Sequence, residues 1–295
     1  MPAVALIGMF DGVHLGHKAL LEAARAISCS EGLRTFVFTF TSHPLATIRP
    51  EDAPPCLTPA PLKCNLLLQS GADEVRMQDF TPEFRALTAE EFLRILHSRY
   101  GVDVLLMGFN HRFGSDGCSD FDFYRRAGER AGVDVRLCSE KMEVDGLTVS
   151  STAIRCALGA HDIALANGML GRPYSIDGIV GHGREIGRTI GFPTANLQPS
   201  CPDQLIPPIG AYAAKATTAD GAEYPAMLNI GCRPTIASSL PSTIEAHLIG
   251  YNADLYGSPL SISLLSYLRP ERRFTSLEAL RAQLSRDLAA VKQLF

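Results

Sequence analysis

Two histidines three positions apart carry the clearest chemistry in this sequence. His14 and His17 close the segment F-D-G-V-H-L-G-H, which directly follows an apolar run that predicts a strand. With a turn at Asp11-Gly12 and a helix from about Val13, both imidazoles lie in the first helical turn, on one face. The unpaired N–H groups and positive dipole end of a helix bind anions there, and the imidazoles add donors for phosphate oxygens. The pair therefore predicts a phosphate or nucleotide site.

The H-x-x-H pattern alone has more ordinary explanations. Two surface histidines by chance would be the first choice, and a zinc pair is a second alternative, although no cluster that could supply a third ligand is evident. Position favours the nucleotide site, because a strand, a tight turn and a helix start succeed one another. Gly16 lies between the histidines and, having no side chain, would let a nucleotide lie against the helix.

Two further segments of the first half carry polar groups at comparable places. G-F-N-H-R-F-G follows another predicted strand and contributes Asn110. S-S-T-A-I-R places hydroxyls at a helix start and an arginine in its first turn, which predicts an anion site at Ser151, Thr152 and Arg155. An ordinary N-cap with a solvent-facing arginine is an equal alternative for that segment alone.

The second half holds a glycine-rich segment, residues 178–188, followed by P-T-A-N. Its backbone amides could wrap around phosphates, and its last arginine adds charge; the candidate contacts are Gly183, Gly187 and Arg188. Thr194 and Asn196 face the same side of an extended segment, and their oxygens are hard ligands suited to Mg²⁺. A bare T-x-N is more often a turn or a strand edge.

Glu245 is the candidate carboxylate of this half. Alternation along residues 243–249 puts the apolar side chains on one face and Glu245 with His247 on the other. We expect Glu245 to project from the core face of a barrel toward a cleft. On this segment alone, a solvated strand carboxylate would be favoured.

The elements that must position these groups differ between the two halves. Apolar runs alternate with helical patterns in the first half, which predicts an α/β fold with a parallel sheet; the expected strands are 3–9, 35–40, 102–107 and 133–137, and the expected helices are 13–27 and 89–100. Ligands of such sheets bind at the carboxyl ends of strands. The chemistry should therefore lie in the turns after Met9, Phe40 and Met107.

The pattern of predicted elements changes after about Leu158. Closely spaced strands without intervening helices predict an antiparallel barrel or sandwich; they are expected at 175–180, 212–217, 224–230, 243–249 and 260–268. A last helix follows the capping-box spacing of Thr275 to Glu278, with an apolar stripe from Leu277 to Val291. The boundary between the halves falls near residues 160–172.

Composition narrows the function classes. A length of 295 residues favours two domains. The net charge of -4 is a poor match for a non-specific nucleic-acid binder, and no apolar run approaches the roughly 18 residues of a membrane span. No secretory signal is visible at the start, so we expect a cytoplasmic protein. Eight scattered cysteines without a C-x-x-C pair favour reduced thiols over a zinc site or disulfides.

Both halves resemble one known family. H-x-G-H after the first strand is similar to the nucleotidylyltransferase superfamily. The fuller phrase, together with G-F-N-H-R-F-G and S-S-T-A-I-R, resembles the FAD synthetase module of bacterial bifunctional riboflavin kinase/FAD synthetases. G-R-T-I-G-F-P-T-A-N-L resembles their riboflavin kinase signature. The resemblance implies a Rossmann-like nucleotidylyltransferase domain at 1–165. At 170–295 it implies an antiparallel six-stranded riboflavin kinase β-barrel closed by the C-terminal helix.

The resemblance also implies reactions and residue roles. The barrel would phosphorylate riboflavin with ATP and Mg²⁺ to FMN, with Glu245 as general base, and the sheet domain would adenylylate FMN to FAD, with His14 and His17 stabilising the transition state. ATP and phosphate contacts would come from Phe10, Asp11, Gly12, Gly16, Asn110, Ser151, Thr152, Arg155, Gly183, Gly187, Arg188 and Asn229. Flavin contacts would come from Arg269 and Glu271, and metal ligands from Thr194 and Asn196. The expected partners are riboflavin, FMN, FAD and ATP, with no nucleic acid and no membrane, in a monomer or weak homo-oligomer.

Two departures and two rivals accompany the resemblance. The first strand begins almost at Met1, whereas the family commonly has a short segment before it. In addition, Ser115-Asp116-Gly117 stands where relatives often carry basic residues. The loss of that positive charge would alter the affinity of the first site for ATP or for the flavin phosphate. One rival is a nucleotidylyltransferase for another acceptor, which would leave the kinase-like half unexplained. The other is a flavin-binding protein that has lost turnover.

Overall fold

The computed structural model divides the chain into two compact units, Met1–Ser151 and Thr152–Phe295. It describes residues 1–108, 111–118, 120–139, 141–182, 191–231 and 243–295. The expected domain limits, 1–165 and 170–295, stay a prediction.

The first unit is built on a five-stranded parallel sheet, as expected. Its strand order is β3-β2-β1-β4-β5; the strands are β1 (Ala3–Ile7), β2 (Arg34–Phe40), β3 (Glu74–Gln78), β4 (Val102–Gly108) and β5 (Asp134–Cys138). Strand β3 was not expected, because its sequence E-V-R-M-Q has no apolar run. It lies at the edge of the sheet, where polar side chains are tolerated.

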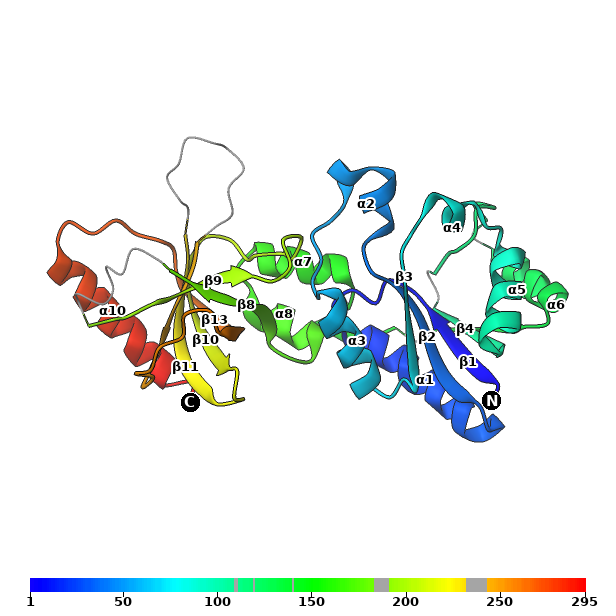
Figure 1. The fold of residues 1–295 in the computed structure, drawn as a ribbon, viewed down its shortest axis with the longest axis horizontal. Coiled ribbons are helices and arrows are strands. Elements are labelled where there is room, and N and C mark those ends of the chain that lie inside the picture. The colour runs from blue at the N-terminus through cyan, green and yellow to red at the C-terminus, as the bar shows by residue number, and fades with distance from the viewer. Residues whose placement is uncertain (109–110, 119, 140, 183–190, 232–242) are drawn as a thin grey trace. The chain divides into compact units, whose positions relative to one another are not determined.

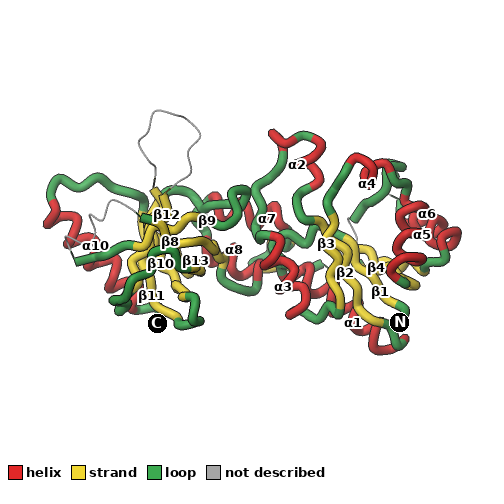
Figure 2. The backbone as a smooth tube through the Cα atoms, viewed as in Figure 1, coloured by secondary structure: helices red, strands yellow, loops and turns green. Residues whose placement is uncertain are grey.

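Helices cover both faces of this sheet (Figures 1 and 2). α1 (Leu15–Glu31) and α3 (Ala60–Gln69) pack on the face that carries Val4 and Leu6. The other face packs against α5 (Ala89–Tyr100) and α6 (Phe121–Ala131). Short elements fill the connections: α2 (Pro44–Ile48), the 3-10 turn η1 (Pro50–Asp52), α4 (Pro82–Ala86) and the hairpin of β6 (Glu143–Val144) with β7 (Leu147–Thr148).

The strand order fixes where this sheet can bind a ligand. The chain runs outward from β1 through β2 to β3, then returns to place β4 on the other side of β1. The connections after β1 and β4 therefore leave the sheet in opposite directions, and ligands of such sheets bind at the carboxyl ends of the strands at such a point. The histidine turn follows β1, and the segment from Gly108 follows β4.

The second unit is a closed six-stranded antiparallel barrel, also as expected. Around it the order is β10-β11-β12-β9-β8-β13; the strands are β8 (Tyr174–Gly181), β9 (Ala195–Pro199), β10 (Gly210–Thr218), β11 (Glu223–Gly231), β12 (Thr243–Leu248) and β13 (Pro259–Arg269). Periodicity indicated every strand except β9, whose A-N-L-Q-P contains one large apolar side chain, Leu197, and ends in a proline. Helices α7 (Ser151–Gly159) and α8 (Ile163–Leu170) precede the barrel.

The last helix, α10 (Leu277–Lys292), packs on the outside of the barrel. Its Val291 joins Ala213 of β10 and Met227 of β11 in an apolar cluster. Two details of the prediction were wrong. The N-cap is Ser276 rather than Thr275, since the Ser276 hydroxyl accepts from the N–H of Ala279, and Leu277 lies outside the buried stripe.

Candidate functional site

The turn that carries the two histidines is locally strained. Phe10 and Val13 have φ of 48° and 42°, and both are almost fully buried. A β-branched residue with positive φ is a true outlier, and such conformations cluster at functional sites. Gly12, with φ of 89°, accommodates the same turn without a Cβ penalty. Surrounding packing holds the loop against its own backbone preference.

The turn brings the predicted histidine pair together. His14 is the N-cap of α1, which begins at Leu15 rather than Val13, and its Nδ1 accepts a hydrogen bond from the His17 N–H at 3.3 Å. The two imidazoles stack with their centroids 3.5 Å apart. A Cβ on Gly16 would lie 3.3 Å from the His14 ring, so the glycine leaves space for the imidazole. Its contact with a nucleotide stays a prediction.

His17 is an uncharged imidazole at neutral pH. Its burial, and to a lesser degree the neighbouring His14 and Lys63, hold its pKa well below the usual range. The Nδ1 atom is buried and has no hydrogen-bond partner among the described residues. Phe10 packs against the ring edge to face at 5.1 Å. A neutral imidazole of this kind can offer a hydrogen bond to an incoming phosphate.

Asp11 holds the backbone around the turn. Its carboxylate accepts from the N–H groups of Leu57 and Thr58 at 2.9 and 3.1 Å, and its carbonyl accepts from the Ser151 hydroxyl at 2.8 Å. Two of the predicted phosphate contacts, Asp11 and Ser151, are thus joined to each other. Their contact with ATP stays a prediction, as does that of Thr152 and Arg155, which lie in the second unit.

Lys63 is a residue of this region that sequence reasoning missed. It lies on α3, is 3% exposed, and donates from Nζ to the carbonyls of Phe40 at 2.6 Å and Met9 at 3.1 Å. Burial lowers its pKa from the ordinary lysine value. The signal available was a single lysine within the otherwise largely apolar A-P-L-K-C-N-L-L-L.

The segment after β4 is tied to the body of the unit. The Tyr124 hydroxyl accepts from the Phe113 N–H at 3.1 Å and donates to the Cys118 carbonyl at 2.8 Å. Asp116, one of the departures from the family pattern, accepts from the Ala89 N–H at the start of α5 at 2.6 Å. His111 is a further missed residue: its Nε2 is buried without a partner among the described residues, and burial lowers its pKa to about 4. Asn110 lies outside those residues.

On the barrel, strand register places four predicted residues in one row. Glu245 pairs with Asn229 on one side and with Asn196 on the other. Asn229 pairs with Ala211, which in turn pairs with Arg269. Side chains directly opposite in neighbouring strands lie about 5 Å apart at Cβ. The sequence order of these residues hides a row across five strands in which only Ala211 is apolar.

Glu245 projects from the outer face of the barrel, and the expectation that it leaves the core face was wrong. Its strand neighbours Ile244, Ala246 and Leu248 are buried and fill the interior, whereas Glu245 and His247 are half-buried on the other face. A small barrel has an interior filled by side chains. The cleft must therefore lie outside the barrel wall.

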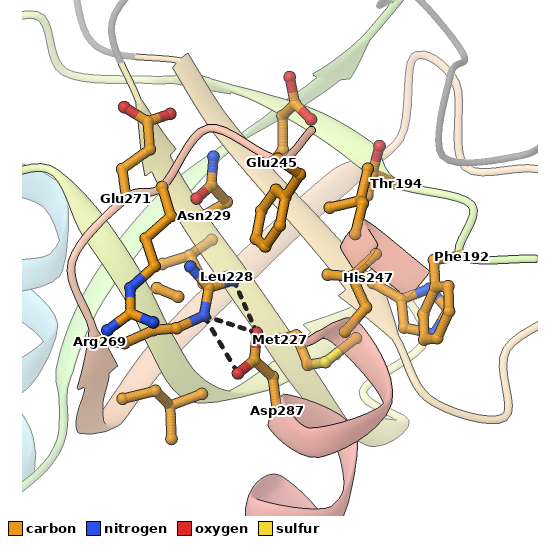
Figure 3. A pocket seen from close by; sticks show the side chains of 16 residues that line it. Phe192, Thr194, Met227, Leu228, Asn229, Glu245, His247, Arg269, Glu271 and Asp287 are labelled. Atoms are coloured by element: carbon orange, nitrogen blue, oxygen red, sulfur yellow. Dashed lines mark hydrogen bonds and ion pairs between the residues drawn. The ribbon is translucent and has the colours of Figure 1, made fainter. Parts of the chain in front are cut away.

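That cleft is a cavity of about 330 Å³ between the barrel wall and α10 (Figure 3). Its polar lining includes Thr194, Asn229, Glu245, Arg269 and Glu271. In Figure 3 the Thr194 hydroxyl and the carboxylates of Glu245 and Glu271 extend to one end, away from the Arg269–Asp287 pair. Apolar lining comes from Phe192, Met227, Leu228, Leu268, Phe274, Leu280 and Leu284. The polar groups of Thr194, Glu245 and Glu271 thus lie at one end of the cavity, and mainly apolar side chains line the remainder.

Arg269 is held by an acid that sequence reasoning missed. Asp287 of α10 accepts from Arg269 at 2.7 and 2.9 Å, and also from the Gln283 amide at 2.7 Å. Both ionic side chains are largely buried, 13% and 7% exposed. The available signal was position, because Asp287 falls three residues after Leu284 and four before Val291, on the apolar face of the helix.

Thr194 lies between two cavities. A second one, of about 440 Å³, shares Thr194 with the first and is lined by Val180, Leu248, Tyr251 and Tyr256. Tyr256 stacks on His182 at 4.1 Å. Behind Thr194, the His247 Nδ1 hydrogen-bonds the Pro193 carbonyl at 2.7 Å, which fixes the segment. Gly183, Gly187 and Arg188 lie outside the described residues.

Comparison with known proteins agrees with this geometry. A FAD synthetase family model matches residues 1–153, and a riboflavin kinase model matches residues 170–295. The protein named bifunctional riboflavin kinase/FMN adenylyltransferase from Pseudomonas fluorescens is 40% identical over 292 residues, 99% of this chain and 92% of that one. The chain belongs to the bifunctional riboflavin kinase/FMN adenylyltransferase family.

More distant relatives also match along nearly the whole chain. The family members of Escherichia coli K12 and Bacillus subtilis are 38% and 34% identical, covering 99% and 97% of this chain and 92% and 90% of theirs. A crystal structure described as a macrolide-efflux protein from Streptococcus pneumoniae has a TM-score of 0.89 at 26% identity, over 99% of this chain and 94% of that one. In the described part of this chain, no helix has the length and apolar character needed to cross a membrane.

The Arg269–Asp287 pair gives a stability prediction for the riboflavin kinase half. Asp287→Ala leaves a buried guanidinium without its partner, and breaking such a pair costs about 3 kcal/mol or more. Urea unfolding followed by circular dichroism should show that loss in the free energy of unfolding. Ser285→Ala, on an exposed position of the same helix, is the control and should change it by less than about 0.5 kcal/mol. Equal effects from both variants would contradict the role of the pair.

Proposed function

We propose that the barrel unit phosphorylates riboflavin to FMN and that the first unit joins FMN to AMP, releasing pyrophosphate and forming FAD. ATP is the co-substrate of both steps. The observation that carries the proposal is that the riboflavin kinase match falls on one unit and nearly all of the FAD synthetase match falls on the other. We further propose that the protein works in the cytoplasm as a monomer or weak homo-oligomer, without nucleic acid or membrane as partner.

In the kinase step, the cavity beneath α10 holds the flavin and Glu245 takes the proton of its 5′-hydroxyl. An alcohol is a poor nucleophile at neutral pH, so a positioned carboxylate accepts the proton as the γ-phosphoryl group transfers. Arg269 and Glu271 bind the flavin, with Arg269 immobilised by Asp287. The apolar lining excludes water from the acceptor. Asn229, next to Glu245 in register, contacts the transferring phosphate.

The ATP of this step extends past Thr194 from the second cavity. That cavity is large enough for a nucleoside and presents Tyr251 and Tyr256 to it, while Thr194 joins it to the cavity that Glu245 lines. The Thr194 hydroxyl and Asn196 amide are hard oxygen donors beside Glu245, which fits Mg²⁺. When bound, Mg²⁺ neutralises charge on the phosphates. Gly183, Gly187 and Arg188 would contact the same phosphates.

In the adenylyl-transfer step, the FMN phosphate attacks the α-phosphorus of ATP directly. The P–O bond to pyrophosphate breaks as the new one forms, so no covalent enzyme intermediate is needed. His14 and His17, stacked at the start of α1, donate to the phosphate oxygens as their charge grows. The helix N-terminus, Phe10, Gly12 and Gly16 shape the nucleotide contact, and Ser151 of the same unit adds its hydroxyl. The phosphate contacts of Asn110, Thr152 and Arg155 stay predictions from the sequence.

Product analysis tests this assignment. The protein, incubated with riboflavin, ATP and Mg²⁺, should convert riboflavin first to FMN and then to FAD, as resolved by chromatography. Unchanged riboflavin would favour a flavin-binding protein without turnover. FMN without FAD would mean that the first unit has no adenylyl-transfer activity toward FMN.

A further inference from the structure

Lys63 lies at the carboxyl ends of the strands, the end of a parallel sheet at which ligands bind. Its Nζ donates to the carbonyl of Phe40, the last residue of β2, and to that of Met9, just after β1. These are the carboxyl ends of adjacent parallel strands. Met9 leads directly into the strained turn at Phe10, so the ammonium secures the base of the segment that carries His14 and His17.

Hydrogen bonds to the two strand-end carbonyls do not by themselves require a charged side chain at this position. Burying an ammonium is costly, and a neutral amide can donate to carbonyls without that cost. Desolvation lowers the pKa of Lys63, and the Asp11 carboxylate and Cys56 thiol oppose that effect. Asp11 also fixes the N–H groups of Leu57 and Thr58, immediately before the helix that carries Lys63. Asp11 thus favours the charged form of Lys63 in the interior, although desolvation is the larger effect.

The charge of Lys63 acts on the imidazole of His17. Among the charged and titratable groups around the His17 imidazole, His14 and Lys63 both lower its pKa, Lys63 from a different helix. The charge of Lys63 and the imidazole of His17 therefore interact across the base of the turn. A fixed cation beside a phosphate site also favours the negative charge that develops there, without reorganisation during the reaction.

We propose that Lys63 is a positioning residue of the adenylyl-transfer site, which fixes the strand ends beneath the histidine turn and supplies a positive charge that acts on His17. The inference rests on the proposed function of the first unit. Lys63 acts through His17 and the turn, and its charge, rather than its hydrogen bonds alone, contributes to turnover.

Two substitutions of Lys63 separate the effect of its charge from the effect of its hydrogen bonds. Lys63→Gln keeps a donor for the carbonyls and removes the charge, whereas Lys63→Arg keeps both. We expect at least a tenfold lower kcat for FAD formation from FMN in the glutamine variant, a smaller change in KM for ATP, and a kcat within about threefold of the wild type in the arginine variant. Lys141→Gln, at an exposed position of the same unit, is the matched control. Riboflavin phosphorylation by the barrel should be unchanged throughout.

Histidine-ring NMR supplies a readout that a structural role would not move. Because Lys63 lowers the pKa of His17, removal of its charge should shift the His17 titration to higher pH in Lys63→Gln and leave it in place in Lys63→Arg and Lys141→Gln. This titration needs no substrate. A wild-type protein that forms no FAD would defeat the proposed function, whereas an unmoved His17 titration would defeat the role of Lys63.

If the glutamine variant does not fold, the pH dependence of FAD formation at alkaline pH tests the proposal with the wild type and Lys63→Arg alone. Lys63, with its lowered pKa, should lose its proton below the usual lysine value near 10.5, and wild-type FAD formation should fall there. An arginine stays charged over that range, so the fall should move to higher pH in Lys63→Arg. Identical alkaline limbs in the two proteins, or equal kcat values for the folded Gln and Arg variants, would overturn the proposal.

Discussion

Replacing His14 with asparagine should suppress FAD formation from FMN by about 10²- to 10³-fold, the range found when one preorganised donor to a transition-state oxyanion is removed. Asparagine is the sharper choice than alanine, because His14 is also the N-cap of α1 and asparagine preserves such a cap. Steady-state assays with FMN and ATP measure the effect. Phosphorylation of riboflavin by the same protein should remain at the wild-type rate.

His97→Asn is the matched control for that experiment. His97 lies in the last turn of α5 and hydrogen-bonds the Val102 carbonyl at the amino end of β4, whereas the histidine turn follows the carboxyl end of β1. It should leave both reactions within about twofold. A parallel loss of both activities in a folded His14→Asn protein would mean that the two reactions do not occupy separate units.

Replacing Glu245 with glutamine should lower FMN formation from riboflavin by about 10²- to 10⁴-fold, the usual contribution of a positioned general base. The amide keeps the shape of the side chain in the polar row between Asn229 and Asn196 but cannot accept the proton. FAD synthesis from supplied FMN should be unaffected. Riboflavin turnover measured by chromatography reports the first effect, and FMN turnover reports the second.

Glu223→Gln provides the comparison for Glu245→Gln. Glu223 opens β11 in the same barrel, is exposed, and pairs with Lys215 on the surface, where loss of an ion pair costs little. Its kinase rate should match the wild type. A Glu245→Gln protein with normal riboflavin turnover would remove Glu245 as the base.

Much of the fold could be predicted from the sequence because periodic burial leaves a local signature. The strands of the sheet that are buried on both faces were expected, because β1 is a continuous apolar run and β2 is rich in phenylalanine and β-branched residues. Strand β3 escaped because an edge strand needs no such run, and β9 escaped because its A-N-L-Q-P combines a polar pair with a proline.

The candidate sites were predictable only where their residues are close in sequence. His14 and His17 share one helical turn, and the structure stacks them. Lys63 and Asp287 act on groups far away in sequence, at Met9 and Arg269, so neither spacing nor a short motif marks them. The face of Glu245 was misjudged because alternation separates two faces without stating which one fills the barrel.

Complementation between two variants tests the division of labour most directly. His14→Asn alone should convert riboflavin to FMN and stop, and Glu245→Gln alone should leave riboflavin unchanged. An equimolar mixture given riboflavin, ATP and Mg²⁺ should form FAD, because FMN released by one protein reaches the intact first unit of the other. A mixture that accumulates FMN or leaves riboflavin untouched, while wild-type protein forms FAD, would contradict two independent sites on one chain.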